Sequence, residues 1–144
     1  MGAVTFEDIA VNLESLGEKV CWRELFGNDA PVEMEIGCGK GGFLLRQARA
    51  HPDRNFFGIE WANKYYRFAV DRMARWGVTN VRIVRTDART FMIERVPPNS
   101  LAALHVYHPD PWPKRRHHKR RLFQPAFVAA ATAALAPGAR WAIQ

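Results

Sequence analysis

Closely spaced glycines with the chemistry of a ligand-binding loop occur in the segment EIGCGKGG. Gly37, Gly39 and Gly42 stand in a GxGxxG arrangement, and glycine allows both a tight turn and the close approach of a ligand to the backbone. The phosphate-binding pattern GxxxxGK[ST] is absent here, because Lys40 is followed by Gly41. The glycines therefore predict a loop for an adenosine-containing cofactor and exclude a P-loop at this position.

Acidic residues stand where such a cofactor needs them. Glu60, eighteen residues after Gly42, ends a predicted strand, where an acid holds ribose hydroxyls in NAD and S-adenosylmethionine alike. Glu35, two residues before the first glycine, can hold the methionine ammonium group, for which NAD has no counterpart; its alternative is a merely buried or paired acid. Asp87 can accept from the adenine amino group, or can simply be a helix N-cap. Together these acids favour S-adenosylmethionine.

Dense positive charge follows a rigidly held acid in the segment HPDPWPKRRHHKRRL. Asp110 lies between two prolines, and six Lys or Arg residues follow within residues 114–121. The chain has 21 Lys+Arg against 14 Asp+Glu, and without those six the balance is 15 against 14, or +1. The excess therefore reads as one local patch, which predicts a polyanionic partner, nucleic acid before membrane. The alternative is a solvated charged loop.

Strands and helices alternate regularly in the part of the sequence that must position these residues. Strands are expected over residues 32–37, 55–60, 81–87, 101–108 and 139–143, and helices over about 40–51, 62–76 and 121–136, with a short helix after the third strand. This order predicts an α/β fold with a doubly wound, mainly parallel sheet that is truncated after its fifth strand. Ligands bind beyond the carboxyl ends of such strands. We therefore expect the strand-end acids Glu35, Glu60, Asp87 and Asp110 at one edge.

The N-terminal part is predicted to be a helical segment spanning residues 1–30, with the cofactor-binding domain over residues 31–144. A helix over residues 5–26 is expected because Thr5 can cap it, with Asp8 three residues on. The sequence then continues this helix with an apolar stripe of Ile9, Leu13, Leu16 and Val20.

Composition limits the class of protein. The chain has 144 residues, of which 48% are hydrophobic, enough for one domain with a sizeable core. Cys21 and Cys38 are too few for a disulfide framework, and the histidines show no metal-binding spacing, so no metal is expected. No apolar run approaches the roughly 18 residues of a membrane span. The N-terminus does not read as a signal peptide. A cytoplasmic location is expected.

These motifs together resemble the bacterial tRNA (guanine-N7-)-methyltransferases. The resemblance runs from about residue 22 to the end and rests on FGNDAPVEMEIGCGKGGFL, FFGIE, RTDA and above all HPDPWPKRRHHKRRL. It implies transfer of a methyl group from S-adenosylmethionine to guanine N7, at position 46 of the tRNA. Family members continue past the fifth strand with two further strands, so the domain is expected to be C-terminally incomplete.

The resemblance also implies a role for each motif residue. The cofactor would be contacted by Glu35, Gly37, Gly39, Glu60, Asp87 and Asp110. Asp110 would in addition be the catalytic residue, and Lys114 would contact the substrate. The RNA-facing stretch would comprise Arg116, His117, His118, Lys119, Arg120 and Arg121. His108 departs from the aromatic residue that is usual in the family, and it is given no catalytic role.

Two other functions remain open at this level. One is a catalytically impaired fragment that retains RNA binding, motivated by the missing C-terminal strands. The other is an NAD-binding oxidoreductase domain, motivated by the GxGxxG pattern with Glu60. The basic segment has no use in an oxidoreductase.

Overall fold

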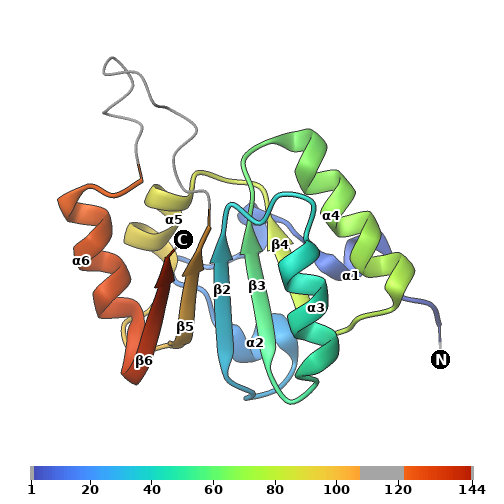
Figure 1. Cartoon of the computed structure of the whole chain (residues 1–144), viewed down its shortest axis with the longest axis horizontal. Coiled ribbons are helices and arrows are strands. Elements are labelled where there is room, and N and C mark those ends of the chain that lie inside the picture. Colours follow the sequence, from blue (N-terminus) through green and yellow to red (C-terminus); the bar gives the residue numbers. More distant parts are fainter. Residues whose placement is uncertain (1, 108–121, 144) are drawn as a thin grey trace.

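The computed structural model describes residues 2–107 and 122–143. Within them lies a six-stranded sheet in the order β1-β4-β3-β2-β5-β6, with every neighbouring pair parallel (Figure 1). The strands are β1 (Ala10–Val11), β2 (Val32–Ile36), β3 (Asn55–Ile59), β4 (Val81–Val84), β5 (Leu101–Val106) and β6 (Leu135–Ile143). The predicted doubly wound parallel sheet is confirmed.

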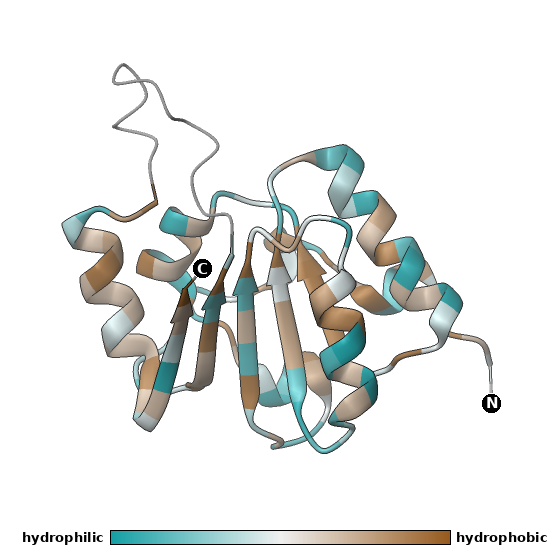
Figure 2. Cartoon of the chain, in the orientation of Figure 1, coloured by the Kyte–Doolittle hydropathy of each residue, from teal (hydrophilic) through white to brown (hydrophobic). Residues whose placement is uncertain are grey.

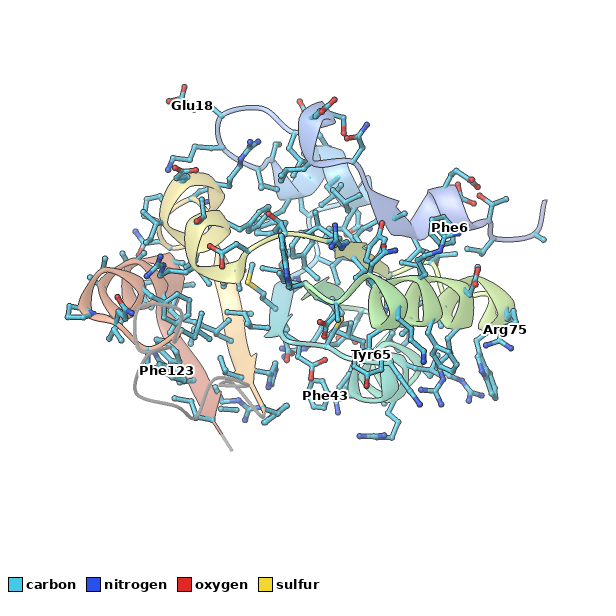
Figure 3. The ribbon with its side chains drawn as sticks, turned by 90° about the horizontal axis from the view of Figure 1, so that it is seen from above. Phe6, Glu18, Phe43, Tyr65, Arg75 and Phe123 are labelled. Carbon is cyan, nitrogen blue, oxygen red and sulfur yellow. The ribbon has the colours of Figure 1, made fainter. Side chains whose placement is uncertain are left out.

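Helices cover both faces of this sheet. One face carries α1 (Phe6–Ile9), α3 (Gly42–Ala50) and α4 (Asn63–Trp76), and the other carries α2 (Trp22–Phe26), α5 (Ala88–Arg95) and α6 (Pro125–Ala134) (Figures 1 and 3). In the part of the chain that is described, no helix is long and apolar enough to cross a membrane.

The two faces have separate hydrophobic cores because side chains alternate along each strand. Phe56 of β3 is buried in the core with α3 and α4. Its neighbour Phe57 is buried in the opposite core, where its ring stacks on Phe91 of α5 at 5.4 Å and meets Trp22 of α2 edge-on at 5.0 Å. Every residue of β2 and β3 is buried, as expected for central strands of a parallel sheet. Figure 2 shows mainly apolar residues along β3, whereas hydrophilic and apolar residues alternate along β2.

The N-terminal part differs from its prediction, since residues 5–26 do not form one helix. The capping box of Thr5 and Asp8 is present, but α1 ends at Ile9 because Ala10 and Val11 become extended and pair with β4. The Asn12 side chain then accepts from the Glu14 N–H and begins the short 3-10 helix Leu13–Ser15. The sheet thereby gains a strand that was not predicted.

The last strand also differs from its prediction. Helix α6 ends at Ala134, and β6 begins at Leu135 rather than after the Pro-Gly pair. The strand accommodates Pro137 and Gly138 by an irregularity in its register against β5, with Gly138 at φ 81°. Proline cannot donate to a strand ladder, so it is tolerated only at such an interruption or an edge.

Replacing Gly41 by Ala is expected to destabilise the protein by more than the same change at Gly27. Both glycines have left-handed φ values, 81° and 78°, and a side chain there costs about 1–2 kcal/mol. At Gly41 the added Cβ would also lie 2.8 Å from Met73 Cε and 3.1 Å from Ala69 Cβ of α4, whereas nothing lies within 4 Å at Gly27. Overpacking adds about 1–3 kcal/mol. Urea unfolding of both variants measures the difference, and equal losses would contradict tight α3–α4 packing at Gly41.

Candidate active site

The carboxyl ends of four strands lie level with one another. Ile36 at the end of β2 pairs with Ile59 of β3 and Val106 of β5, and Ile59 pairs in turn with Val84 of β4. Residues that directly follow these strands therefore meet at one edge, seen at the top of Figure 1. This is the edge where open α/β sheets bind ligands.

The glycine loop turns back over this edge directly after β2. Gly37 and Gly39 have φ values of 72° and 57°, which only glycine adopts without strain. The N–H groups of Gly37 and Cys38 both donate to the carbonyl of Ile59, at 2.8 and 3.1 Å. The loop is thus attached to the end of β3, and its glycines form the tight turn that the sequence predicts.

Glu60 fixes the other side of the same loop. Its Oε1 accepts from the Gly39 N–H at 2.8 Å, and its Oε2 accepts from the Ala62 N–H at 2.8 Å. Each carboxylate oxygen has a second lone pair, so both remain able to accept from a ligand hydroxyl. Glu60 therefore has a structural role in the loop that the sequence pattern did not reveal.

Glu35 is buried beneath the loop without a complete set of partners. Its exposed fraction is 4%, and its Oε1 has no hydrogen-bond partner among the residues described. Burial raises the pKa of this carboxyl to about 8; Arg46 opposes the shift and Glu60 adds to it. A buried polar atom without a partner costs about 1–3 kcal/mol, and such an atom in a native fold calls for an explanation. A cationic ligand would provide one.

Asp87 follows β4 and caps α5. Its Oδ2 accepts from the Thr90 N–H at 3.0 Å and from the Thr90 hydroxyl at 2.6 Å. The N-cap alternative is therefore correct. Both bonds fall on Oδ2, so Oδ1 is left for a ligand donor at the exposed end of the strand.

A hydrogen-bonded row beside Glu35 was missed by sequence reasoning. His105 Nε2 lies 2.7 Å from Glu33 Oε1, and His105 Nδ1 lies 2.9 Å from the Tyr107 hydroxyl. Arg54 donates to the other Glu33 oxygen at 2.7 Å. The His105 hydrogen bond lowers the pKa of Glu33, and Arg54 adds to this. The ionised Glu33 can only accept hydrogen bonds, so His105 Nε2 donates to it.

This row extends the site along β5. Phe43 of α3 packs against His105 and Tyr107, with ring centroids 4.8 and 5.1 Å apart. The available sequence signal was the same-face spacing of residues 33 and 35 and of residues 105 and 107. Only the pairing of β2 with β5 brings these two pairs together.

An exposed aromatic residue follows Glu60 and was also missed. Trp61 is 61% exposed, and the Arg85 guanidinium lies 4.8 Å from its ring centroid while Arg85 Nε donates to the Trp61 carbonyl at 2.9 Å. A stacked cation holds the ring in place at the carboxyl edge.

The predicted catalytic and RNA-facing residues lie outside the described residues. These are Asp110, Lys114, Arg116, His117, His118, Lys119, Arg120 and Arg121. Tyr107, the last described residue before them, directly follows β5, as Glu60 directly follows β3.

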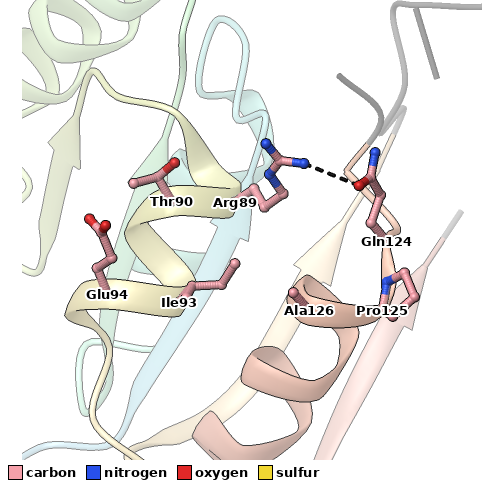
Figure 4. A pocket seen from close by; sticks show the side chains of 7 residues that line it. All are labelled: Arg89, Thr90, Ile93, Glu94, Gln124, Pro125 and Ala126. Carbon is pink, nitrogen blue, oxygen red and sulfur yellow. Dashed lines mark hydrogen bonds between the residues drawn. The ribbon is translucent and has the colours of Figure 1, made fainter. Parts of the chain in front are cut away.

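A hollow of about 480 Å³ lies elsewhere, between α5 and α6 (Figure 4). Arg89 donates to Gln124 Oε1 across its opening at 3.2 Å. Its lining consists of Arg89, Thr90, Ile93, Glu94, Gln124, Pro125 and Ala126. Among the described residues, none of the predicted site residues lines it, but Thr90, which hydrogen-bonds to Asp87, does.

A family model described as "Putative methyltransferase" matches residues 29–144. The chain belongs to this methyltransferase family. Two similar relatives are the tRNA (guanine-N(7)-)-methyltransferases of Geobacter metallireducens and Myxococcus xanthus. They are 44% and 46% identical over 89% and 81% of this chain. The aligned part covers 61% and 57% of those relatives, so the chain spans somewhat over half their length.

Solved structures of methyltransferases share the fold of this family member. A SAM-dependent methyltransferase from Aquifex aeolicus superposes with a TM-score of 0.60 at 16% identity, covering 91% of this chain and 60% of that one. A phosphoethanolamine N-methyltransferase from Haemonchus contortus, solved with S-adenosylhomocysteine, superposes with a TM-score of 0.59 at 19% identity. The superposition covers 85% of this chain and 26% of that one. At such identities the likeness shows the fold alone.

Replacing Glu35 by Gln is expected to stabilise the protein relative to the wild type by an amount that grows with pH. Between its ordinary pKa of 4.5 and about 8, Glu35 holds a proton in the folded chain that the unfolded chain releases. Its contribution to the free energy of unfolding therefore falls by about 1.4 kcal/mol per pH unit in that window. Gln has no such proton.

The measurement is urea unfolding at about pH 5.5, 7 and 8.5. The stability difference between Glu35→Gln and the wild type should grow with pH. Glu24→Gln, on the exposed surface of α2, is the matched control. A difference that stays constant across this range would contradict a buried, proton-holding Glu35.

Proposed function

We propose that this chain is the cofactor-binding part of a tRNA (guanine(46)-N(7))-methyltransferase that uses S-adenosylmethionine. The observation that carries the proposal is Glu35. A buried carboxyl with an oxygen lacking any partner in the described chain lies below a glycine loop, in a member of a methyltransferase family. The names of the relatives support tRNA as the substrate and guanine N7 as the atom that is methylated.

The residues at the strand edge fit this cofactor. Glu35 would hold the methionine ammonium group, which supplies the missing donor and the opposite charge. Glu60 would accept from the ribose hydroxyls with the lone pairs that Gly39 and Ala62 leave unused. Asp87 would accept from the adenine amino group with Oδ1, because Thr90 occupies Oδ2. Gly37 and Gly39 would let the cofactor approach the backbone.

An NAD-dependent oxidoreductase fits the same edge less well. Glu60 and the glycine loop would serve either cofactor. NAD, however, brings no cation to Glu35, whose buried oxygen would stay without a partner. We therefore do not favour the oxidoreductase.

Methyl transfer to guanine N7 makes modest demands on the protein. When bound, S-adenosylmethionine supplies an activated methyl group on a sulfonium sulfur. Guanine N7 has an exposed lone pair and no proton to lose, so no general base is required. The protein has to align the base, and such positioning can lower the barrier by about 7–11 kcal/mol. A carboxylate beside the base would stabilise the positive charge that it gains.

Asp110 is the residue that we propose for this role. It lies between Pro109 and Pro111 in the sequence, and proline fixes the backbone φ on either side, so little conformational entropy is lost on binding. The basic residues 114–121 would grip RNA phosphates, which carry affinity without sequence information. We propose a cytoplasmic location for this reaction, because the proposed substrate is tRNA.

Cofactor binding should release a proton from Glu35. S-adenosylhomocysteine, the product, carries the same ammonium group. At pH 7 a carboxyl with a pKa of about 8 is mostly protonated, and the ammonium would ionise it. Calorimetric titrations in buffers of different ionisation enthalpy should show nearly one proton released per ligand. Glu35→Gln should abolish this release and weaken binding about 30-fold or more, as when a buried charge loses its partner. Unchanged affinity would remove Glu35 from the cofactor site, and Glu24→Gln is the control.

The reaction itself is tested by incubating unmodified bulk tRNA with labelled S-adenosylmethionine and identifying the methylated nucleoside. We expect 7-methylguanosine from the wild type. Asp110→Ala should lower the rate of methyl transfer about a hundredfold or more and should still bind S-adenosylhomocysteine. Asp53→Ala, in the exposed turn before β3, should transfer normally. Binding without any transfer by the wild type would favour the impaired-fragment alternative.

A further inference from the structure

Charge is segregated along the chain in a way that the net balance hides. Residues 1–39 contain eight Asp or Glu and two Lys or Arg, whereas residues 40–76 contain three Asp or Glu and eight Lys or Arg. The second stretch includes the last residues of the glycine loop, from Lys40 on, together with α3 and α4. Outside residues 114–121 the charges nearly balance, but this balance hides a second local concentration of positive charge.

Seven of these cations form what we call the α3–α4 basic face. They are Lys40, Arg46, Arg49, Lys64, Arg67, Arg72 and Arg75. Figure 3 shows α3 and α4 side by side on one side of the sheet, with Tyr65 and Arg75 near the two ends of α4. Hydrophilic residues run along both helices in Figure 2.

No salt bridge among the described residues neutralises the charge of this face. In residues 2–107 and 122–143, the salt bridges are Arg23 with Asp29 and Glu33 with Arg54 and His105. None of the seven cations takes part in one. Surface cations are commonly interspersed with acids, and here Asp71 is the only acid on α4.

Aromatic rings hold several of these cations in place. Lys40 Nζ and the Arg72 guanidinium lie 5.4 and 5.9 Å from the centroid of the Phe68 ring, and the Arg49 guanidinium lies 4.5 Å from that of Trp76. Both rings are exposed. A ring orders a cation without cancelling its charge, so the cations stay available to an anionic partner.

Two guanidinium groups also converge at the start of α3. A Cβ on Gly42 would lie 3.4 Å from Arg46 Nη1 and 3.7 Å from Arg72 Nη1. Arg72 Nη1 donates to the Lys40 carbonyl at 3.2 Å, which keeps it beside the glycine loop. Like charges brought together repel one another, and a bound phosphate would relieve that repulsion.

We propose that the α3–α4 basic face is a second RNA-binding surface, which contacts the backbone phosphates of the tRNA whose guanine enters the strand-end site. This inference rests on the proposed function. Lys40 belongs both to the glycine loop and to this face, so the surface is continuous with the site. Exposed aromatic residues among cations are typical of single-stranded and irregular nucleic acid contacts.

A membrane surface fits this face less well. Helices that lie in a bilayer interface present aliphatic as well as aromatic side chains. The exposed large hydrophobic residues on α4 are Tyr65, Phe68 and Trp76, all aromatic, whereas the exposed Ile93, Val128 and Ile143 lie on α5, α6 and β6.

The test compares two charge-matched variants of the 144-residue chain in binding to unmodified tRNA over a range of salt concentrations. Lys64→Glu/Arg75→Glu changes the face at two exposed positions of α4. Lys19→Glu/Arg23→Glu makes the same change in net charge near α2, on the other side of the sheet. Calorimetric binding of S-adenosylhomocysteine is measured in parallel, and vesicles of phosphatidylglycerol provide a second anionic partner.

We expect the α4 variant to bind tRNA at least about tenfold more weakly at about 150 mM salt, with the slope of log K against log salt reduced by about 1–2. The tRNA affinity of the α2 variant should change less than about twofold. Both variants should bind S-adenosylhomocysteine like the wild type. Equal effects of the two variants on tRNA, or wild-type binding to vesicles but not to tRNA, would overturn the inference. Failure of every chain to bind S-adenosylhomocysteine would instead refute the proposed function, and the tRNA slopes would still decide the role of the face.

Discussion

The attachment of the glycine loop to the end of β3 is the constraint on which the site depends. Two N–H groups of the loop donate to the Ile59 carbonyl, and Glu60 accepts from a third at Gly39. These bonds require β2 and β3 to end level, which their register provides. They also set where α3 begins, so one small set of backbone contacts places the loop, the helix and Glu60 together. A slip of one residue between the two strands would separate all three.

Glu35 shows how such a site stores unfavourable free energy. The carboxyl is buried, has a raised pKa, and has one oxygen without a partner among residues 2–107 and 122–143. Glu33, two residues earlier on the same strand face, is also buried, yet Arg54 and His105 satisfy it and keep its pKa low. Burial dominates the pKa of Glu35, whereas the hydrogen bond from His105 dominates that of Glu33. The fold completes one carboxylate with its own side chains, whereas no described residue completes the other.

Much of this arrangement was predictable from local sequence. The helix expected over about residues 62–76 is confirmed as α4, which ends at the left-handed Gly77. The N-terminal helix failed because Ala10 and Val11 pair with a strand some 70 positions away, and no local pattern reports that pairing. The Glu33–His105–Tyr107 row was not predicted for the same reason, because it forms only when β2 pairs with β5. The roles of Asp110 and the basic segment remain predictions, because they rest on resemblance and not on described contacts.

The segregated charge gives the molecule an uneven electric field. Acids such as Glu14, Glu18 and Glu24 belong to the N-terminal part, and Figure 3 shows Glu18 at the opposite corner of the molecule from Arg75. A separation of this kind is a dipole, and an approaching polyanion exerts a torque on it before any atoms touch. The molecule would thus be turned with its glycine loop forward during diffusion, and fewer encounters would be lost to wrong orientations.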